Sequence, residues 1–466
     1  MNDHPYQLGS PLTNKYITTD FSEALLEFVT PPFNIRGEEL SFLDDAHHFA
    51  HLNIDDEKLW PFSIAPYTKD SDITIAKYGR SNLARFKELY RSGLAERHGK
   101  AMQTIAGVHF NYSFSDDFID KYLEIANDQI SINEIYLRTV RNIYRNNWLL
   151  LLLFGASPVV SNNLLKKSET DYVTIGKYSY FPNATSLRMS DLGYQNTVNE
   201  FDISLASIKN YTESLLAATN EVCESFIGIN KNAQISPNIL QIEDEYYSAA
   251  RPKSSVASNE RQIKKLRNHG IQYIELRSID INPFEPIGIN SQTIKFLEAF
   301  IVFCMLSESP NINKNEFKDI KDNDLLVSKY GRLPGLKINK DGKKIDIKSY
   351  SSEVLFKMLE IAELFQTNKN EYVKVIESKI QEVKNPDLSQ SSTFLDKFLS
   401  SGLSYFNFGY EIAKDNKVQY KNRESKIKEN YVIIQKEAKK SISRTKSIEI
   451  KDSSSFEDFM ENYFLI

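Results

Sequence analysis

A charged pair stands out in the stretch IQYIELRSIDINPF at residues 271–284. The apolar and turn-forming residues around the pair predict a β-strand that ends in a turn. Side chains of a strand alternate between its two faces, so Glu275 and Arg277 point the same way and Leu276 points the other way. Such a face can hold a metal ion beside a phosphate group. Taken alone, the pattern is more simply explained by a solvated strand face or a structural ion pair.

Three further residues have side chains that bind divalent metal ions. Asp20 and Glu27 stand seven residues apart, which places both carboxylates on one face if this segment is helical. His109 lies in a second predicted strand, and Glu275 completes the set. Oxygen-rich sites suit Mg²⁺ or Mn²⁺, and a single histidine is tolerated better by Mn²⁺. We therefore expect Mg²⁺, with Mn²⁺ as the alternative ion.

Cationic side chains in several segments could contact an anionic substrate, and they are Arg188, Arg251, Lys253 and Arg277. Guanidinium groups bind phosphate or carboxylate oxygens in forked geometry. Metal ligands together with such cations favour phosphoryl transfer, because both offset the charge of the transferred group. The sequence has no Walker or glycine-rich nucleotide loop, so an ATP site must be of another kind. No Ser/His/Asp or Cys/His spacing points to nucleophilic hydrolysis, although spacing alone does not exclude it.

Two helices are expected in the N-terminal part. The segment TTDFSEALLEFVTPP at residues 18–32 predicts a helix, because Asp20 and Glu23 form a capping box and Pro31 stops the helix. The segment NLARFKELYRSGLAERHG at residues 82–99 predicts a second helix that closes near Gly99.

Two more segments alternate like the strand that carries Glu275. They are MQTIAGVHFNYSF at residues 102–114 and NILQIEDEYYSAARPK at 238–253, the latter with Gln241, Glu243 and Glu245 on its polar face. Three such strands predict an antiparallel sheet backed by helices, with the open polar face as the site. From about residue 290 the chain is expected to be mostly helical. The charge-rich stretch at 421–452 is typical of a solvated helix or of partial disorder.

The composition narrows the class of protein. The 466 residues are 41% hydrophobic, enough for a large core, and the net charge of -5 gives no general attraction to nucleic acid or to an anionic membrane. Cys223 and Cys304 are the only cysteines, so there is no disulfide framework or zinc pattern, as expected for a cytoplasmic protein. The apolar run WLLLLLFGASPVV at 148–160 is too short to span a bilayer and predicts a buried helix end.

Long motifs follow one another along the chain: YITTDFSEALLEFVTP, DDEKLWPFSIAPY, KYGRSNLARFKELYRSGL, MQTIAGVHFNYSF, LFGASPVV, NATSLRMSDLGY, LQIEDEYYSAARPK and GIQYIELRSIDINPFEPIGI. Together they closely resemble the proteobacterial type of the glutamate-cysteine ligase family, strongly over residues 5–310 and more weakly to 410. The resemblance implies an α+β fold similar to the glutamine synthetase catalytic domain, an antiparallel sheet with surrounding helices. It also implies ATP-dependent joining of the γ-carboxylate of L-glutamate to the amine of L-cysteine through γ-glutamyl phosphate, the first step of glutathione biosynthesis.

The resemblance assigns roles to individual residues by matching motif. The residues that look like metal ligands are Asp20, Glu27, His109 and Glu275. Arg277 looks like a phosphate contact and is the expected catalytic residue. The residues that resemble the lining of the amino-acid pocket are Phe21, Tyr90, Gln103, Asn111, Arg188, Tyr194 and Tyr247. On this reading Glu275 holds a metal ion and Arg277 holds the phosphate that the ion bridges.

The sequence departs from the family pattern at its N-terminus. The family's catalytic sheet opens with a strand carrying Gly-x-Glu-x-Glu, whose glutamates are metal ligands, and no such segment precedes Asp20. We therefore expect a missing N-terminal strand and an incomplete metal site. An inactive homologue that binds glutamate or nucleotide is one alternative, and a ligase with another amine acceptor is a weaker one. The expected organisation is a truncated catalytic domain at 1–410 and a charged helical tail at 411–466, acting as a monomer.

Overall fold

The structure is a computed structural model that describes residues 3–126, 130–193, 201–255, 260–365, 367–423 and 428–465. The helices are α1 Glu38–Asn53, α2 Asn82–His98, α3 Asp116–Ala126, α4 Ile132–Phe154, α5 Ile208–Asn220, α6 Glu224–Ile227, α7 Gln262–His269, α8 Ser291–Leu306, α9 Lys314–Tyr330, α10 Ile347–Ala362, α11 Lys369–Lys384, α12 Gln390–Ser401, α13 Tyr405–Lys421, α14 Glu429–Lys451 and α15 Phe456–Phe464. The strands are β1 Ile17–Thr19, β2 Leu26–Phe28, β3 Val108–Tyr112, β4 Val159–Ser161, β5 Val173–Ile175, β6 Tyr178–Tyr180, β7 Ala250–Lys253, β8 Tyr273–Ile279, β9 Lys337–Lys340 and β10 Lys343–Asp346.

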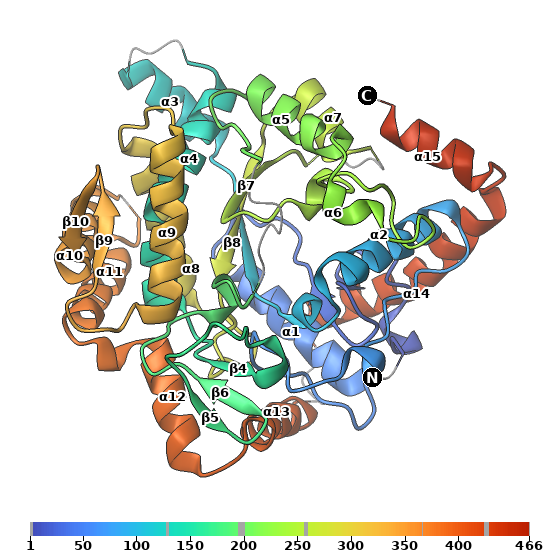
Figure 1. The fold of residues 1–466 in the computed structure, drawn as a ribbon, viewed down its shortest axis with the longest axis horizontal. Helices are drawn as coiled ribbons and strands as arrows, with labels where there is room; N and C mark the ends of the chain where they lie inside the picture. Colours follow the sequence, from blue (N-terminus) through green and yellow to red (C-terminus); the bar gives the residue numbers. More distant parts are fainter. Residues whose placement is uncertain are drawn as a thin grey trace.

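A three-stranded antiparallel sheet in the order β3-β8-β7 lies at the centre of the molecule. In Figure 1 it stands between α4, α8 and α9 on one side and α1 and α2 on the other. The backs of the strands are apolar, and Ile274 and Leu276 of β8 are fully buried. The register shifts by one residue between Val108 and Phe110, which indicates a β-bulge beside His109. This sheet confirms the predicted antiparallel arrangement and leaves one face open.

Helix α4 forms the main support of the sheet. Ser131 caps it by accepting a hydrogen bond from the backbone amide of Glu134, and the helix ends at Gly155. Its last turns, including Trp148 and Leu150, are buried, so the prediction of a buried helix end is confirmed. Among the described residues, no helix combines the length and the apolar character that a membrane span requires.

The segment predicted as the first helix is a β-hairpin instead, so that prediction was wrong. Strands β1 and β2 pair antiparallel, with Thr18 opposite Glu27, and Asp20 starts the turn between them. Glu23, expected in a capping box, accepts hydrogen bonds from the backbone amides of His4 at 2.8 Å and Lys77 at 2.6 Å. These tertiary contacts outweigh the local signal. The second predicted helix is confirmed as α2, which closes at Gly99.

The third predicted strand is confirmed only in its last four residues, β7. Residues 238–249 instead form an irregular segment with a 3₁₀ turn at Glu243–Glu245. Glu243 pairs with Arg261 at 2.8 Å and Glu245 pairs with Arg97 at 3.1 Å, both largely buried. Gln241 is fully buried. These side chains therefore anchor neighbouring elements and do not line the open face.

The C-terminal part is mostly helical, as predicted, but it contains a hairpin that the sequence analysis missed. Strands β9 and β10 are joined at Asp341 and Gly342, which have φ angles of 50° and 73°. An Asp-Gly pair tolerates these left-handed conformations, so it was an available hairpin signal.

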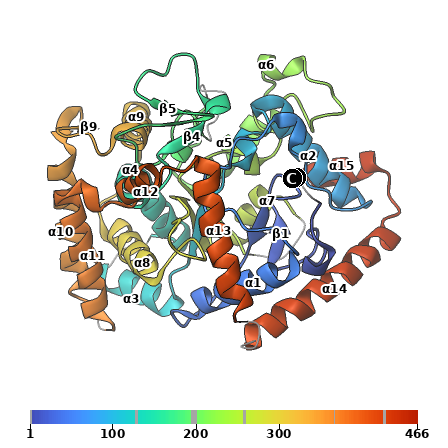
Figure 2. The ribbon, with the colours of Figure 1, turned by 90° about the horizontal axis from the view of Figure 1, so that it is seen from below.

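Helix α14 is not an isolated, solvated helix. It packs on α1 and on the N-terminal segment, and Tyr431, Ile434 and Ala438 share a buried core with Leu8 and Ile17. Figure 2 shows α14 running alongside α1 near β1. The boundary expected at residue 411 falls inside α13. Division into a catalytic domain and a tail remains a prediction.

Candidate functional site

A row of polar side chains crosses the open face of the β3-β8-β7 sheet. Glu275 on β8 is directly opposite Asn111 on β3 and Arg251 on β7. Residues that oppose each other in an antiparallel pair share a face, so the three side chains lie side by side. His109 is on the same exposed side of β3. The structure therefore brings together residues from segments more than 130 positions apart.

Two cations and a histidine lie close to the carboxylate of Glu275. Its Oε2 lies 3.0 Å from Nη1 of Arg277 and 4.0 Å from Nζ of Lys253, and its Oε1 lies 3.8 Å from Nδ1 of His109. Burial opposes ionisation of this carboxyl, but Lys253, Arg277 and Arg251 outweigh it and hold the pKa of Glu275 well below its usual range. Glu275 is thus a permanent anion on the open face.

Arg277 has N–H donors that make no hydrogen bond in the described structure. One of its five N–H donors is satisfied by Glu275, and Nε is buried without a hydrogen-bond partner in the described part of the chain. Its backbone amide donates to the carbonyl of Ala249 at 2.8 Å, which holds the strand in place. Burial opposes the charge of Arg277, but Glu275 and Tyr247 reverse this and raise the pKa of the guanidinium. A fixed cation with unused donors suits an oxyanion ligand.

Helix α2 adds two cations that the sequence analysis did not select. Nζ of Lys87 lies 5.2 Å and Cζ of Arg91 lies 4.7 Å from the centre of the Tyr78 ring. Nε of Arg91 also donates to the backbone carbonyl of Asp20. Burial, with Arg91, lowers the pKa of Lys87 to about 8. The four-residue spacing of the two cations on a predicted helix was the signal that could have found them.

The β1-β2 hairpin supplies two carboxylates to this region. Glu27 is exposed at the surface, yet protein around its carboxyl group desolvates it, and this desolvation, with the Asp20 carboxylate, raises the pKa of Glu27 to about 7. Glu275 contributes in the same direction and Arg91 opposes it. Desolvation also raises the pKa of Asp20, against Arg91 and Arg277. The two carboxylates come together through a hairpin, not through the helix face predicted from their spacing.

The charge pattern fits a divalent cation, although the side chains do not form a closed ligand shell. Within the described ranges, no group of three or more His, Cys, Asp or Glu side chains is arranged around one metal position. Mutual repulsion between Asp20, Glu27 and Glu275 is what a bound cation would relieve. Desolvation and the charge of Arg277 lower the pKa of His109 to about 3, so its ring is neutral and can accept a metal.

The residues predicted for the amino-acid pocket have different surroundings. Phe21 and Gln103 are buried, with 1% and 3% exposure, so they form walls and not open contacts. Tyr90 is half-buried, and Tyr247 donates a hydrogen bond to Sδ of Met189 at 2.8 Å. Asn111 is exposed on β3. Tyr194 lies outside the described residues.

Arg188, another predicted pocket residue, is held by a buried ion pair. It is 3% exposed, and its Nε lies 2.6 Å from Oδ1 of Asp280, which is 1% exposed. Its Nη2 donates to the backbone carbonyl of Arg277 at 3.1 Å, which places the guanidinium under the open face of β8.

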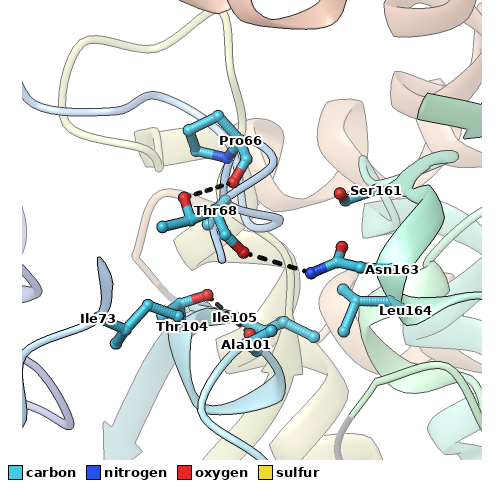
Figure 3. Close-up of a pocket in the computed structure, with 10 residues that line it drawn as sticks. Pro66, Thr68, Ile73, Ala101, Thr104, Ile105, Ser161, Asn163 and Leu164 are labelled. Atoms are coloured by element: carbon cyan, nitrogen blue, oxygen red, sulfur yellow. Dashed lines mark hydrogen bonds between the residues drawn. The ribbon is translucent and has the colours of Figure 1, made fainter. Parts of the chain in front are cut away.

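The small pocket shown in Figure 3 lies apart from this face. It is lined by Thr68, Thr104, Asn163 and seven other residues, and Asn163 donates to the carbonyl of Thr68 across it at 3.3 Å. Its volume is about 10 Å³, room for one water molecule at most. None of the predicted site residues lines it.

Comparison with known proteins identifies relatives along nearly the whole chain. The family model described as glutamate-cysteine ligase matches residues 1–327. The chain is 38% identical to the glutamate-cysteine ligase of Alcanivorax borkumensis, covering 99% of this chain and 91% of that protein, and 38% identical to the one from Aliivibrio fischeri, with the same coverage. The crystal structure of glutamate-cysteine ligase from Francisella tularensis in complex with AMP is similar with a TM-score of 0.93 and 33% identity, covering 99% of this chain and 93% of that one.

Proposed function

The chain belongs to the glutamate-cysteine ligase family. We propose that it performs the ligase reaction of this family on the open face of the β3-β8-β7 sheet. The reaction is ATP-dependent ligation of L-glutamate to L-cysteine. The similarity extends over full-length relatives, which supports an active ligase and not the inactive homologue considered from the sequence.

The reaction has two steps. An oxygen of the glutamate γ-carboxylate attacks the γ-phosphorus of ATP, ADP leaves, and γ-glutamyl phosphate forms. The amine of cysteine then attacks the acyl carbon, phosphate leaves with the former carboxylate oxygen, and the amine loses a proton. Activation is needed because a free carboxylate is a poor electrophile.

The placement of Glu275 and Arg277 on one open face is the observation that supports this location most strongly. Two anions, ATP and glutamate, must approach each other, so fixed cations are required where they meet. We assign Arg277 to the transferred phosphoryl group. Its unpartnered Nε and its unused Nη donors are in keeping with this role. Lys253 and Arg251, on the neighbouring strand, add positive charge around the same anion.

For the metal we propose Mg²⁺, with Mn²⁺ as the alternative, held by Asp20, Glu27, His109 and Glu275. The metal supplies charge neutralisation between the phosphates and the carboxylate. In addition to desolvation, the carboxylates of Asp20 and Glu275 both raise the pKa of Glu27, which supports a single metal position near these three side chains.

For the amino-acid substrates we propose a pocket beside the row at Glu275. Its members are Phe21, Tyr90, Gln103, Asn111, Arg188, Tyr194 and Tyr247, with Tyr194 and Tyr247 on the cysteine side. Arg188 offers a guanidinium to a substrate carboxylate. We further propose that the protein acts as a monomer in the cytoplasm.

The test is an assay of the purified protein with ATP, Mg²⁺ and both amino acids. We expect γ-glutamylcysteine, ADP and phosphate in equal amounts, and no product when either amino acid is omitted. ATP hydrolysis that proceeds without glutamate, or better use of another amine than of cysteine, would contradict the proposal.

A further inference from the structure

Asp280 is a buried carboxylate that the reaction scheme leaves without a role. It follows β8 directly and is 1% exposed. Its Oδ2 accepts hydrogen bonds from the amide of Ala156 at 2.8 Å and from Oγ of Ser157 at 2.6 Å. Its Oδ1 accepts from Oγ of Ser186 at 2.9 Å and from Nε of Arg188 at 2.6 Å. Four donors around one buried anion fix its position, because an ionised group away from water is tolerated only when it is fully paired.

The guanidinium of Arg188 is engaged along one edge. Nε donates to Asp280, and Nη2 donates to the carbonyl of Arg277. Nη1 lies against Gly107, where an added Cβ would come within 2.7 Å of both Cζ and Nη1. No acceptor among the described residues takes the Nη1 hydrogens. The Nη1–Nη2 end thus keeps N–H hydrogens that no acceptor in the described structure takes, and it is the end that can form a forked pair with a carboxylate.

The Nη1–Nη2 end of Arg188 lies close to the open face of the sheet. The carbonyl that holds Nη2 is part of β8, and Gly107 directly precedes β3. A carboxylate bound by Arg188 would thus lie near the residues assigned to phosphoryl transfer.

We propose that Asp280 is a positioning residue that fixes Arg188 from behind and presents its Nη1–Nη2 end to a carboxylate of glutamate. This inference rests on the proposed function, in which Arg188 lines the amino-acid pocket. An unrestrained arginine loses side-chain entropy when it is immobilised. Because Asp280 immobilises it during folding, that cost does not fall on substrate binding.

The experiment is a double-mutant cycle with D280N, R188A and the combined variant. In each variant we measure KM for glutamate, cysteine and ATP, glutamate binding by calorimetry, and the thermal unfolding midpoint. D280N should raise KM for glutamate by about tenfold or more, since a buried charge-assisted hydrogen bond is lost. KM for ATP should stay close to its wild-type value. In the R188A background the additional effect of D280N should disappear, because both changes act through one contact.

Two controls keep the test decisive. D324N replaces another buried carboxyl group, whose Oδ2 accepts a hydrogen bond from Asn147 at 2.7 Å on the far side of the sheet, and it should leave KM for glutamate unchanged. If D280N does not fold, D280E keeps the charge but moves it by one methylene, and it should also raise KM for glutamate. The inference is overturned if D280N raises all three KM values alike, if its effect persists in full without Arg188, or if D280E binds glutamate normally. Absence of ligation by the wild-type protein would instead refute the proposed function, and calorimetry would still test the role of Asp280.

Discussion

Nη1 of Arg277 donates a hydrogen bond to Oε2 of Glu275 at 3.0 Å, and both side chains stand on the open face of the same strand. The pair keeps the guanidinium in one orientation and leaves Nε without an acceptor in the described structure. Glu275 also lies within 4.0 Å of Lys253. The carboxylate therefore organises two cations around a position where an anion can bind.

Lysine at position 277 should impair the reaction more than the fold. R277K keeps the charge but loses the forked hydrogen bonds, so kcat should fall by roughly ten- to a hundredfold, about 1.4 to 3 kcal/mol in activation free energy. Steady-state kinetics and thermal unfolding of the same preparations measure the two effects. A purely structural ion pair with Glu275 would give the reverse pattern, a lower unfolding midpoint with kcat largely spared.

Removal of one hairpin carboxylate should weaken metal binding. E27Q keeps the size of the side chain but lowers the negative charge near Asp20 and Glu275, and hard cations depend on the number of charged oxygen ligands. The Mg²⁺ concentration that gives half-maximal activity should rise, and direct titration with Mn²⁺ should show weaker binding. E96Q, an exposed position on α2, is the matched control. Equal Mg²⁺ dependence of E27Q and wild type would remove Glu27 from the metal site.

Asp324 should make the protein less stable as the pH rises. Burial raises the pKa of Asp324 from 3.8 to about 8, so between these values the folded state holds a proton that the unfolded state has released. The free energy of unfolding must therefore fall as the pH increases through this window. D324N is neutral at every pH, so the difference between its unfolding midpoint and that of wild type should shift in favour of D324N as the pH rises from about 4 to about 8. A constant difference across this range would show that Asp324 is ionised in the folded protein.

His51 should have the opposite effect in acid. Burial, with His47 and Lys417 nearby, lowers the pKa of His51 from 6.5 to about 3, so the unfolded state binds a proton that the folded state does not. Stability is then present above about pH 6.5 and is lost as the pH falls toward about 3. H51F keeps the stacking on Tyr420, where the ring centres are 4.7 Å apart, and should lose less stability than wild type on acidification. H269F, at an exposed histidine, should behave like wild type, and an H51F curve parallel to wild type would contradict the prediction.

Local patterns predicted those elements whose partners are near in sequence or whose periodicity is strong. The face of β8 with Glu275 and Arg277, the polar face of β3 at His109, and helix α2 follow from alternation, spacing and capping alone. The β1-β2 hairpin does not follow from such local patterns. Glu23 accepts hydrogen bonds from the backbone amides of His4 and Lys77, so the chain around it cannot remain helical.

The site was predictable as a set of residue types but not as a set of contacts. Glu243 and Glu245 looked like members of a polar strand face, yet distant arginines bury them in ion pairs. The environment of Arg188 depends on Asp280, 92 positions later in the chain, and no spacing rule connects the two. Lys87 and Arg91 could have been found from their shared helix face.

The most direct test of the central claim follows one oxygen atom. Purified protein is given ATP, cysteine and glutamate labelled with ¹⁸O in the γ-carboxylate, and the released phosphate is analysed by mass spectrometry. Activation through γ-glutamyl phosphate predicts that one ¹⁸O atom passes from glutamate to each phosphate as γ-glutamylcysteine forms. Product formation with unlabelled phosphate would contradict the account, because the carboxylate would then not have been phosphorylated.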